Sequence, residues 1–150
     1  MRDEEKLFVR SLMLVCTVLL ISTACQLSSR SAEAVTRRNP EAVLRAYFTA
    51  WNRNDSNTQK SLVTENYAET TWYPEPVESV VLVSAQMLDE DSARLWSPGS
   101  FDTTRVYSVI FDYNPRGRGF SMERGRYTWT YTLIWDAERG SWLISSYGAA

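Results

Sequence analysis

The stretch of sequence that decides the fold is Arg126-Tyr127-Thr128-Trp129-Thr130-Tyr131-Thr132-Leu133-Ile134-Trp135. Aromatic or apolar residues alternate in it with positions that are mostly threonine. Because successive side chains of a strand point to opposite faces, this alternation predicts a strand with one aromatic face and one threonine face. A slip of one residue would exchange the two faces, so the register is tightly specified.

Three further strands are expected, at residues 77–88, 105–113 and 142–147. The second of them places Tyr107, Val109, Phe111 and Tyr113 on one face. The first strand has apolar residues at both odd and even positions, which predicts that both of its faces are buried near its centre. Regular alternation would set Val77, Val81, Val83, Ala85 and Met87 on one face, and Val80, Leu82 and Leu88 on the other.

Two helices are expected before the strands. Asn39 can cap exposed amides, Pro40 fits the first helical position, and Glu41 complements the helix dipole. This helix runs to about Arg53, and its apolar stripe consists of Val43, Leu44, Tyr47, Phe48 and Trp51. A shorter helix, capped by Asp55 or Ser56, is expected to reach about residue 64 and to bury Leu62 and Val63.

Helices followed by strands joined mainly through hairpins are typical of an α+β fold. We expect two N-terminal helices packed on a curved antiparallel sheet of about four strands, all within one domain at residues 39–150. Pro74 and Pro76 predict an extended connection over 70–78, and residues 89–103 are expected to form a polar loop.

Residues 1–24 are typical of a bacterial lipoprotein signal peptide. A charged start precedes an apolar run at 12–21, and Ser22-Thr23-Ala24 supplies small side chains just before Cys25. We expect cleavage before Cys25 and acylation of its sulfur. The run is shorter than the roughly 20 residues of a spanning helix. An uncleaved signal and a buried helix are the alternatives.

The polar, serine-rich residues 25–38 predict a flexible tether. The domain would then be exported and anchored by a diacylglyceryl group on Cys25, either outside the cell membrane or on the periplasmic side. Arg30, Arg37 and Arg38 could contact anionic lipid or simply solvate the tether.

The composition excludes several kinds of chemistry. The chain has no histidine, and its two cysteines are Cys16, in the apolar run, and Cys25. Ser–His and Cys–His nucleophile pairs, histidine zinc sites and imidazole bases are therefore excluded. A net charge of −2 favours no polyanionic partner, so no nucleic acid is expected. We expect no cofactor. We also expect no metal site, because the acidic group at 89–91 lacks the ligand spacing of a calcium-binding loop.

Several short segments together resemble the nuclear-transport-factor-2-like superfamily, and especially the uncharacterised bacterial lipoproteins within it. The segments are Pro40 to Asn52, Asp55, Leu62-Val63, and Gly140 to Ile144 followed by Tyr147-Gly148. The resemblance covers about residues 39–148. It implies a conical, mainly apolar pocket between sheet and helices, used by some members for catalysis and by others for ligand binding or association. Fuller members have a third helix and a longer sheet, which implies a reduced cone here or further strands near 67–73.

The resemblance implies that aromatic residues line the pocket. The candidates are Tyr47, Trp51, Tyr107, Phe111, Trp129, Tyr131 and Trp135. Such rings could orient a small apolar ligand, or they could simply form the core or a homodimer interface. An isomerase or cyclase of this fold would need an acid in the pocket, and Asp112 is the obvious one. Strand alternation points Asp112 away from the aromatic face, however.

A basic set brackets the expected hairpin between the second and third strands: Arg116, Arg118, Arg124 and Arg126. Because arginine binds anions through two parallel hydrogen bonds, this set could grip a phosphate or a lipid headgroup. It could equally keep the hairpin tip soluble and discourage edge pairing.

The sequence therefore predicts a lipid-anchored extracytoplasmic binding or interaction module whose partner is a small apolar ligand or an envelope protein. An isomerase or cyclase acting on a small apolar ligand in the cone is the alternative.

The lipid anchor is tested by Cys25→Ser. Serine has no thiol for the diacylglyceryl group, so this variant should lose incorporation of labelled fatty acid and leave the membrane fraction. Cys16→Ser is the matched control and should keep both. A Cys25→Ser protein that stays membrane-bound and labelled would contradict the anchor.

Overall fold

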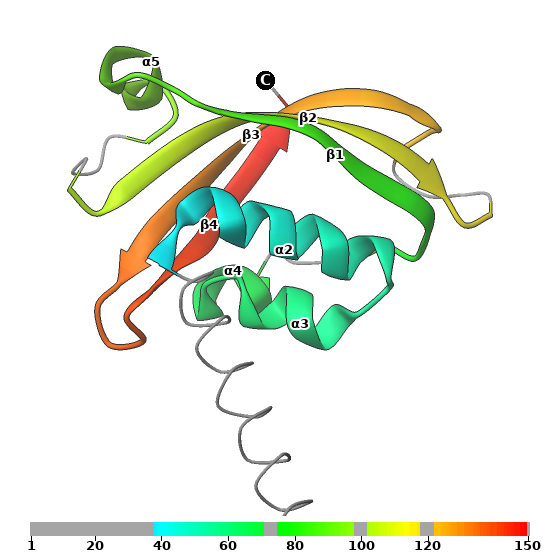
Figure 1. The fold of residues 1–150 in the computed structure, drawn as a ribbon, viewed down its shortest axis with the longest axis horizontal. Helices are drawn as coiled ribbons and strands as arrows, with labels where there is room; N and C mark the ends of the chain where they lie inside the picture. The colour runs from blue at the N-terminus through cyan, green and yellow to red at the C-terminus, as the bar shows by residue number, and fades with distance from the viewer. Residues whose placement is uncertain (1–37, 71–74, 98–101, 118–121, 150) are drawn as a thin grey trace, which may run out of the picture. The chain divides into compact units, whose positions relative to one another are not determined.

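The computed structural model describes residues 38–70, 75–97, 102–117 and 122–149. The fold is α+β, with four antiparallel strands in the order β1-β2-β3-β4. Its elements are α2 (Pro40–Asn52), α3 (Ser56–Ser61), α4 (Glu65–Thr70), β1 (Val77–Met87), α5 (Glu90–Arg94), β2 (Thr104–Pro115), β3 (Gly125–Asp136) and β4 (Ser141–Ala149). Helices α2, α3 and α4 lie on one side of the sheet (Figure 1).

Strand β3 confirms the prediction from its alternating sequence. It pairs with β2 from Thr104↔Ile134 to Tyr113↔Gly125 without a register shift. Tyr131, on its helix-facing side, is completely buried. The unbroken ladder keeps the aromatic positions of β2 and β3 opposite one another, as in the Tyr107↔Tyr131 pair.

Strand β1 does not alternate regularly, and the predicted division of its faces is wrong. Its pairing with β2 shifts between Val77 and Ser79 and again between Leu82 and Ser84. Each β-bulge inserts one residue and so reverses the alternation after it. The buried or partly buried apolar residues of β1 are Val77, Val80, Leu82 and Ala85, while Val81 and Val83 are exposed.

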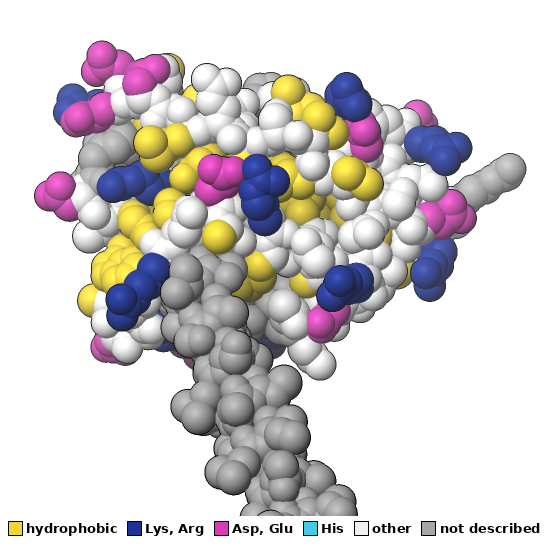
Figure 2. Space-filling model, viewed as in Figure 1, with side chains coloured by type: hydrophobic (Ala, Val, Ile, Leu, Met, Phe, Trp, Pro, Cys, Tyr) yellow, Lys and Arg dark blue, Asp and Glu magenta, His cyan; other side chains and the backbone are white. Residues whose placement is uncertain are grey.

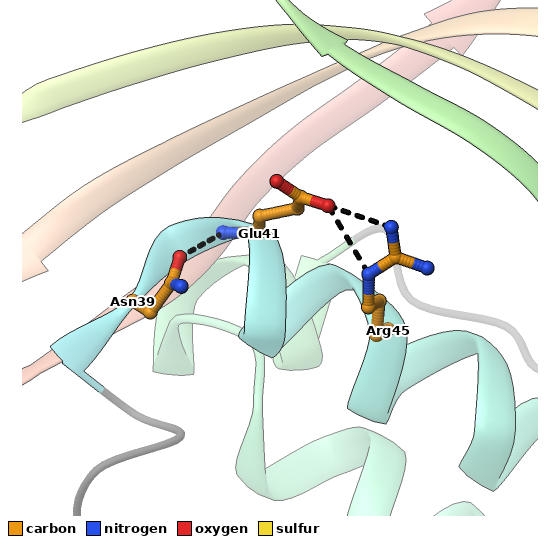
Figure 3. Close-up of polar contacts among 3 residues, drawn as sticks. All are labelled: Asn39, Glu41 and Arg45. Atoms are coloured by element: carbon orange, nitrogen blue, oxygen red, sulfur yellow. Dashed lines mark hydrogen bonds and ion pairs between the residues drawn. The ribbon is translucent and has the colours of Figure 1, made fainter.

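Helix α2 begins as its sequence predicts. The Asn39 side chain accepts a hydrogen bond of 3.0 Å from the Glu41 amide, and Pro40 occupies the first turn. One turn further, Arg45 donates to Glu41 at 2.7 and 3.1 Å (Figure 3). All five apolar residues of the expected stripe are buried against the rest of the fold. Most of the stability of such a helix comes from packing this stripe.

The chain after α2 contains two short helices. Asp55 caps α3, since its carboxylate accepts from the Thr58 amide at 3.1 Å and the Thr58 hydroxyl at 2.6 Å. This helix ends at Ser61, earlier than expected, because Leu62 leaves it to pair with β4 through Ile144. Residues 65–70 then form α4, so the implied strand near 67–73 is wrong where the structure describes it. Residues 71–74 lie outside the described residues.

Two asparagines tie the end of α2 to the start of β1. The side-chain oxygen Oδ1 of Asn52 accepts a hydrogen bond from the Val80 backbone amide at 2.9 Å. Asn54 accepts from the Val77 amide at 2.9 Å and donates to the Val77 carbonyl at 3.1 Å. Asn54 has a φ of 54°, in the left-handed region that asparagine tolerates better than most residues.

Replacing this asparagine tests the tie. Asn54→Ala removes both hydrogen bonds to Val77 and leaves a side chain that disfavours positive φ, so the free energy of unfolding should fall by about 2 kcal/mol. Asn57→Ala, on the exposed side of α3, is the control and should stay within about 0.5 kcal/mol of the parent. Urea unfolding followed by tryptophan fluorescence measures both. Equal losses would show that the tie contributes nothing of its own.

Candidate functional site

The aromatic pocket candidates all come from α2, β2 and β3. Five of them form a continuous cluster, in which the ring contacts are Tyr47–Trp51 at 6.1 Å, Tyr47–Tyr131 at 6.2 Å, Trp51–Phe111 at 6.0 Å and Phe111–Trp129 at 5.4 Å. Four of these five are buried and belong to the core, while Trp129 is partly exposed. The same rings therefore fill the core and, at Trp129, reach the surface.

The other two candidates lie apart from this chain of contacts. Trp135 packs edge-on against Trp142 at 5.7 Å, and Trp142 carries the Arg105 guanidinium over its ring at 5.2 Å. Tyr107 is buried, and burial raises the pKa of its hydroxyl, with a further contribution from the negative charge of Glu41. The structure thus gathers five of the seven predicted residues into one cluster.

Two tyrosines that are not among the seven predicted pocket residues join the cluster. Tyr147 of β4 contacts the Tyr131 ring at 5.1 Å, and Tyr67 of α4 contacts Tyr147 at 5.3 Å. Tyr147 ends the predicted strand at 142–147 and belongs to the resemblance, so alternation along that strand could have pointed to it. Tyr67 lies on a helix that was not predicted, so no comparable signal marked it.

The hydroxyl of Tyr131 is the unusual polar group of this cluster. The residue is completely buried, and its oxygen has no hydrogen-bond partner among the described residues. Burial raises the pKa of Tyr131 well above its usual value, and the neighbouring tyrosines 47, 147 and 67 raise it further. A buried hydroxyl without a partner costs about 1–3 kcal/mol. Native proteins keep few such groups, and each calls for an explanation.

Partly exposed rings lie at the edge of the cluster. Trp129 and Tyr147 stack with their centroids 5.2 Å apart and an interplanar angle of 18°. Tyr127 stacks on Phe111 at 5.8 Å, and its hydroxyl donates to the Glu123 carbonyl at 2.8 Å. Both rings of the stacked pair are partly exposed, so part of their apolar surface is accessible.

Asp112 does not belong to the aromatic face, as strand alternation predicts. It forms a two-bond ion pair with Arg126, the residue opposite it on β3, at 2.7 and 2.9 Å. The Arg126 hydrogen bond lowers the pKa of Asp112, which stays ionised. Another carboxylate, that of Glu75, accepts from the Tyr113 hydroxyl at 3.0 Å, and burial followed by this bond raises the pKa of Tyr113.

The predicted basic set does not form one anion site among the described residues. Arg126 is engaged by Asp112, and the exposed Arg116 donates its backbone amide to the Pro76 carbonyl at 3.2 Å. Arg124 lines a hollow of about 300 Å³ that also contains Asp112, whose charge opposes an anion. Arg118 lies outside the described residues.

The described residues contain neither a candidate metal site nor a membrane-spanning helix. In the ranges given above, no three acidic, cysteine or histidine residues are grouped so that they could hold a metal ion. None of the helices in that part of the chain has the length and apolar character needed to cross a bilayer. Cys25, the predicted lipidation site, lies outside the described residues, as does the tether.

The chain belongs to the family described as a domain of unknown function, DUF4829, which matches residues 41–148. This range runs from the first turn of α2 to the end of β4. No curated protein matches the chain. Among solved structures, the chain is similar to a SEC-C motif-containing protein from Rhodopseudomonas palustris, with a TM-score of 0.49 and 12% identity over 75% of this chain and 80% of that one.

The buried tyrosines predict a loss of stability at alkaline pH. Unfolded tyrosines titrate near pH 10.0, whereas burial raises the pKa values of Tyr67, Tyr113 and Tyr131 above that. Above pH 10 the unfolded chain therefore releases protons that the folded chain retains, and stability falls as pH rises.

The absorbance of tyrosinate and the fluorescence of tryptophan, followed together through an alkaline titration, check this prediction. Ionisation of the buried tyrosines should coincide with unfolding. Their full ionisation near pH 10 in a protein that remains folded would contradict it.

Proposed function

We propose that this protein is an exported, lipid-anchored binding module of the nuclear-transport-factor-2-like type, holding a small aromatic ligand against the aromatic cluster. The α+β fold, with helices on one face of the sheet, is compatible with a cone-like pocket. The single observation that carries the proposal is the buried Tyr131 hydroxyl, which has no hydrogen-bond partner in the part of the chain that the structure describes.

That hydroxyl determines the ligand chemistry. Tyr131 is protonated at neutral pH, and burial raises its pKa further, so its O–H group can donate one hydrogen bond to a ligand. A carbonyl, carboxylate or phenolate oxygen is a suitable acceptor. The stacked Trp129–Tyr147 pair would hold the planar, apolar part of the same molecule.

The positions of the acids favour binding over catalysis. An isomerase or cyclase needs a carboxylate that can move a proton at the ligand. Asp112 lies on the opposite face and is held by Arg126, and Glu75 is bonded to Tyr113. Tyrosine hydroxyls remain beside the site, and they can bind and orient an oxygen without being ionised.

The predicted lipid anchor would set where in the cell this binding takes place. A diacylglyceryl group on Cys25 and a tether over 25–38 would hold the domain close to the membrane surface outside the cytoplasm. Ligands of the expected kind, apolar with one polar atom, also partition to that surface.

A ligand-induced thermal shift tests the proposal. The full-length chain in detergent is screened against mono- and bicyclic aromatic ketones, carboxylates and phenols, and a ligand that binds only the folded state raises the melting temperature. Tyr131→Phe removes the hydroxyl but keeps the ring, so it should abolish the shift. Without ligand it should melt at the parent temperature or above, because an unsatisfied buried hydroxyl has been removed.

Tyr113→Phe is the matched control. It removes a hydroxyl that does have a partner, Glu75, so it should lower the melting temperature and keep the ligand-induced shift. A screen without any shift, or a shift that survives Tyr131→Phe unchanged, would refute the ligand site.

A further inference from the structure

A groove lies between α2 and β1, and Phe48, whose ring also contacts Tyr131 at 5.6 Å, forms part of its lining. It has a volume of about 420 Å³. Its lining consists of Arg45, Phe48, Thr49, Asn52 and Arg53 from the helix side, and Val80, Val81 and Leu82 from the strand. Figure 2 shows apolar side chains gathered over this region, interrupted by basic and acidic ones.

The strand that borders the groove is an edge of the sheet, since β1 pairs with β2 alone among the described strands. The Val80 amide points to the edge, where Asn52 accepts its hydrogen bond. The Leu88 amide donates to the Val106 carbonyl of β2, so it points toward β2. Because successive amides of a strand point to opposite sides, the backbone groups of Met87 and Ala85 face the free edge. Within the described residues, no side chain bonds to the edge between Leu82 and Met87. An open row of donors and acceptors can pair with another strand.

The same stretch of β1 exposes apolar side chains. Val81, Val83 and Met87 are 52%, 46% and 54% exposed. Natural sheet edges usually carry charges or proline that discourage pairing, and β1 has neither between Ser79 and Met87. The edge is therefore suited to receive an extended segment with apolar side chains.

The charge of the groove distinguishes between possible occupants. Both cations of the lining come from α2 and its end, at Arg45 and Arg53, and none of the described residues that line the groove is acidic. Glu41 neutralises Arg45. Arg53 forms no ion pair with a described residue, although its charge acts on the nearby Asp55. An acidic group on the occupant would meet Arg53 in the groove.

We infer that β1 and this groove form a docking site for an extended peptide segment of another protein, apolar at alternate positions and carrying an acidic residue. The segment adds a strand to β1 at Leu82–Met87 through backbone hydrogen bonds. Its apolar side chains pack beside Val81, Val83 and Met87, and its carboxylate pairs with Arg53. Backbone pairing supplies affinity, and the groove supplies selectivity.

A phage library of random ten-residue peptides, selected on the full-length chain in detergent, tests this inference. Enriched peptides should share alternating apolar residues and at least one Asp or Glu. A labelled synthetic copy of the enriched peptide then reports affinity by fluorescence polarisation. Arg53→Glu should weaken binding by about tenfold, whereas Lys60→Glu, the same charge change on exposed α3, should stay within about twofold.

A backbone variant separates strand addition from charge alone. Ala85→Pro removes an amide that faces the edge and not β2, a position where proline is tolerated, so the domain should fold and lose affinity. Tyr131→Phe should leave peptide binding unchanged, because Tyr131 is not among the residues that line the groove and its ring, which packs on Phe48, is kept.

Three results would overturn the inference. The first is a phage selection that enriches no peptides with alternating apolar residues and an acidic residue. The second is an equal loss of peptide affinity for Arg53→Glu and Lys60→Glu. The third is a dimer, seen in sedimentation equilibrium, that Ala85→Pro dissociates. The last result would assign the edge to a second copy of the chain.

Discussion

The packing of Phe48 against the sheet is the contact on which the rest of the domain depends. Its ring lies 5.3 Å from Phe111 of β2 and 5.6 Å from Tyr131 of β3. Helix α2 is thereby fixed over two adjacent strands, and Tyr47 and Trp51 extend the contact to either side. Burial of such large rings is the main favourable term in a domain that has no disulfide among its described residues. The same packing encloses the Tyr131 hydroxyl and sets one wall of the groove beside β1.

Most of the architecture could be predicted because periodicity and burial agree in it. The alternation of Arg126–Trp135 predicted β3, and the Asn39-Pro40-Glu41 start with its apolar stripe predicted α2. Strand β1 was located correctly, but its faces were not. A β-bulge leaves no residue signature as specific as a turn, and the apolar residues at both parities of β1 concealed the two register shifts. Helix α4 is one short segment with few apolar residues, so its periodicity was too weak to detect.

The candidate site was also predictable only in part. Aromatic positions at strand and helix spacing could be placed on one face from the sequence, and five of them do meet. Whether a particular buried hydroxyl is hydrogen-bonded could not be inferred from the sequence. Whether the Tyr131 oxygen finds a partner depends on α4 and β4, which pack around it from distant parts of the chain, so no local pattern encodes it. The groove beside β1 was not predicted for a related reason, since its lining comes from α2 and β1, which are separated in the sequence.

The hydrogen bonds between Asn54 and Val77 have a consequence for how this chain can vary. They join two residues 23 positions apart, and so they close the base of the segment that contains α3 and α4. Its second attachment is the short pairing of Leu62 and Thr64 with Ile144. A loop closed at its base costs little more entropy when it is lengthened. Insertions between these attachments would change what covers the aromatic cluster while the ladder of β1 to β4 keeps its register. Relatives could thus reshape the lid of the site without rebuilding the sheet.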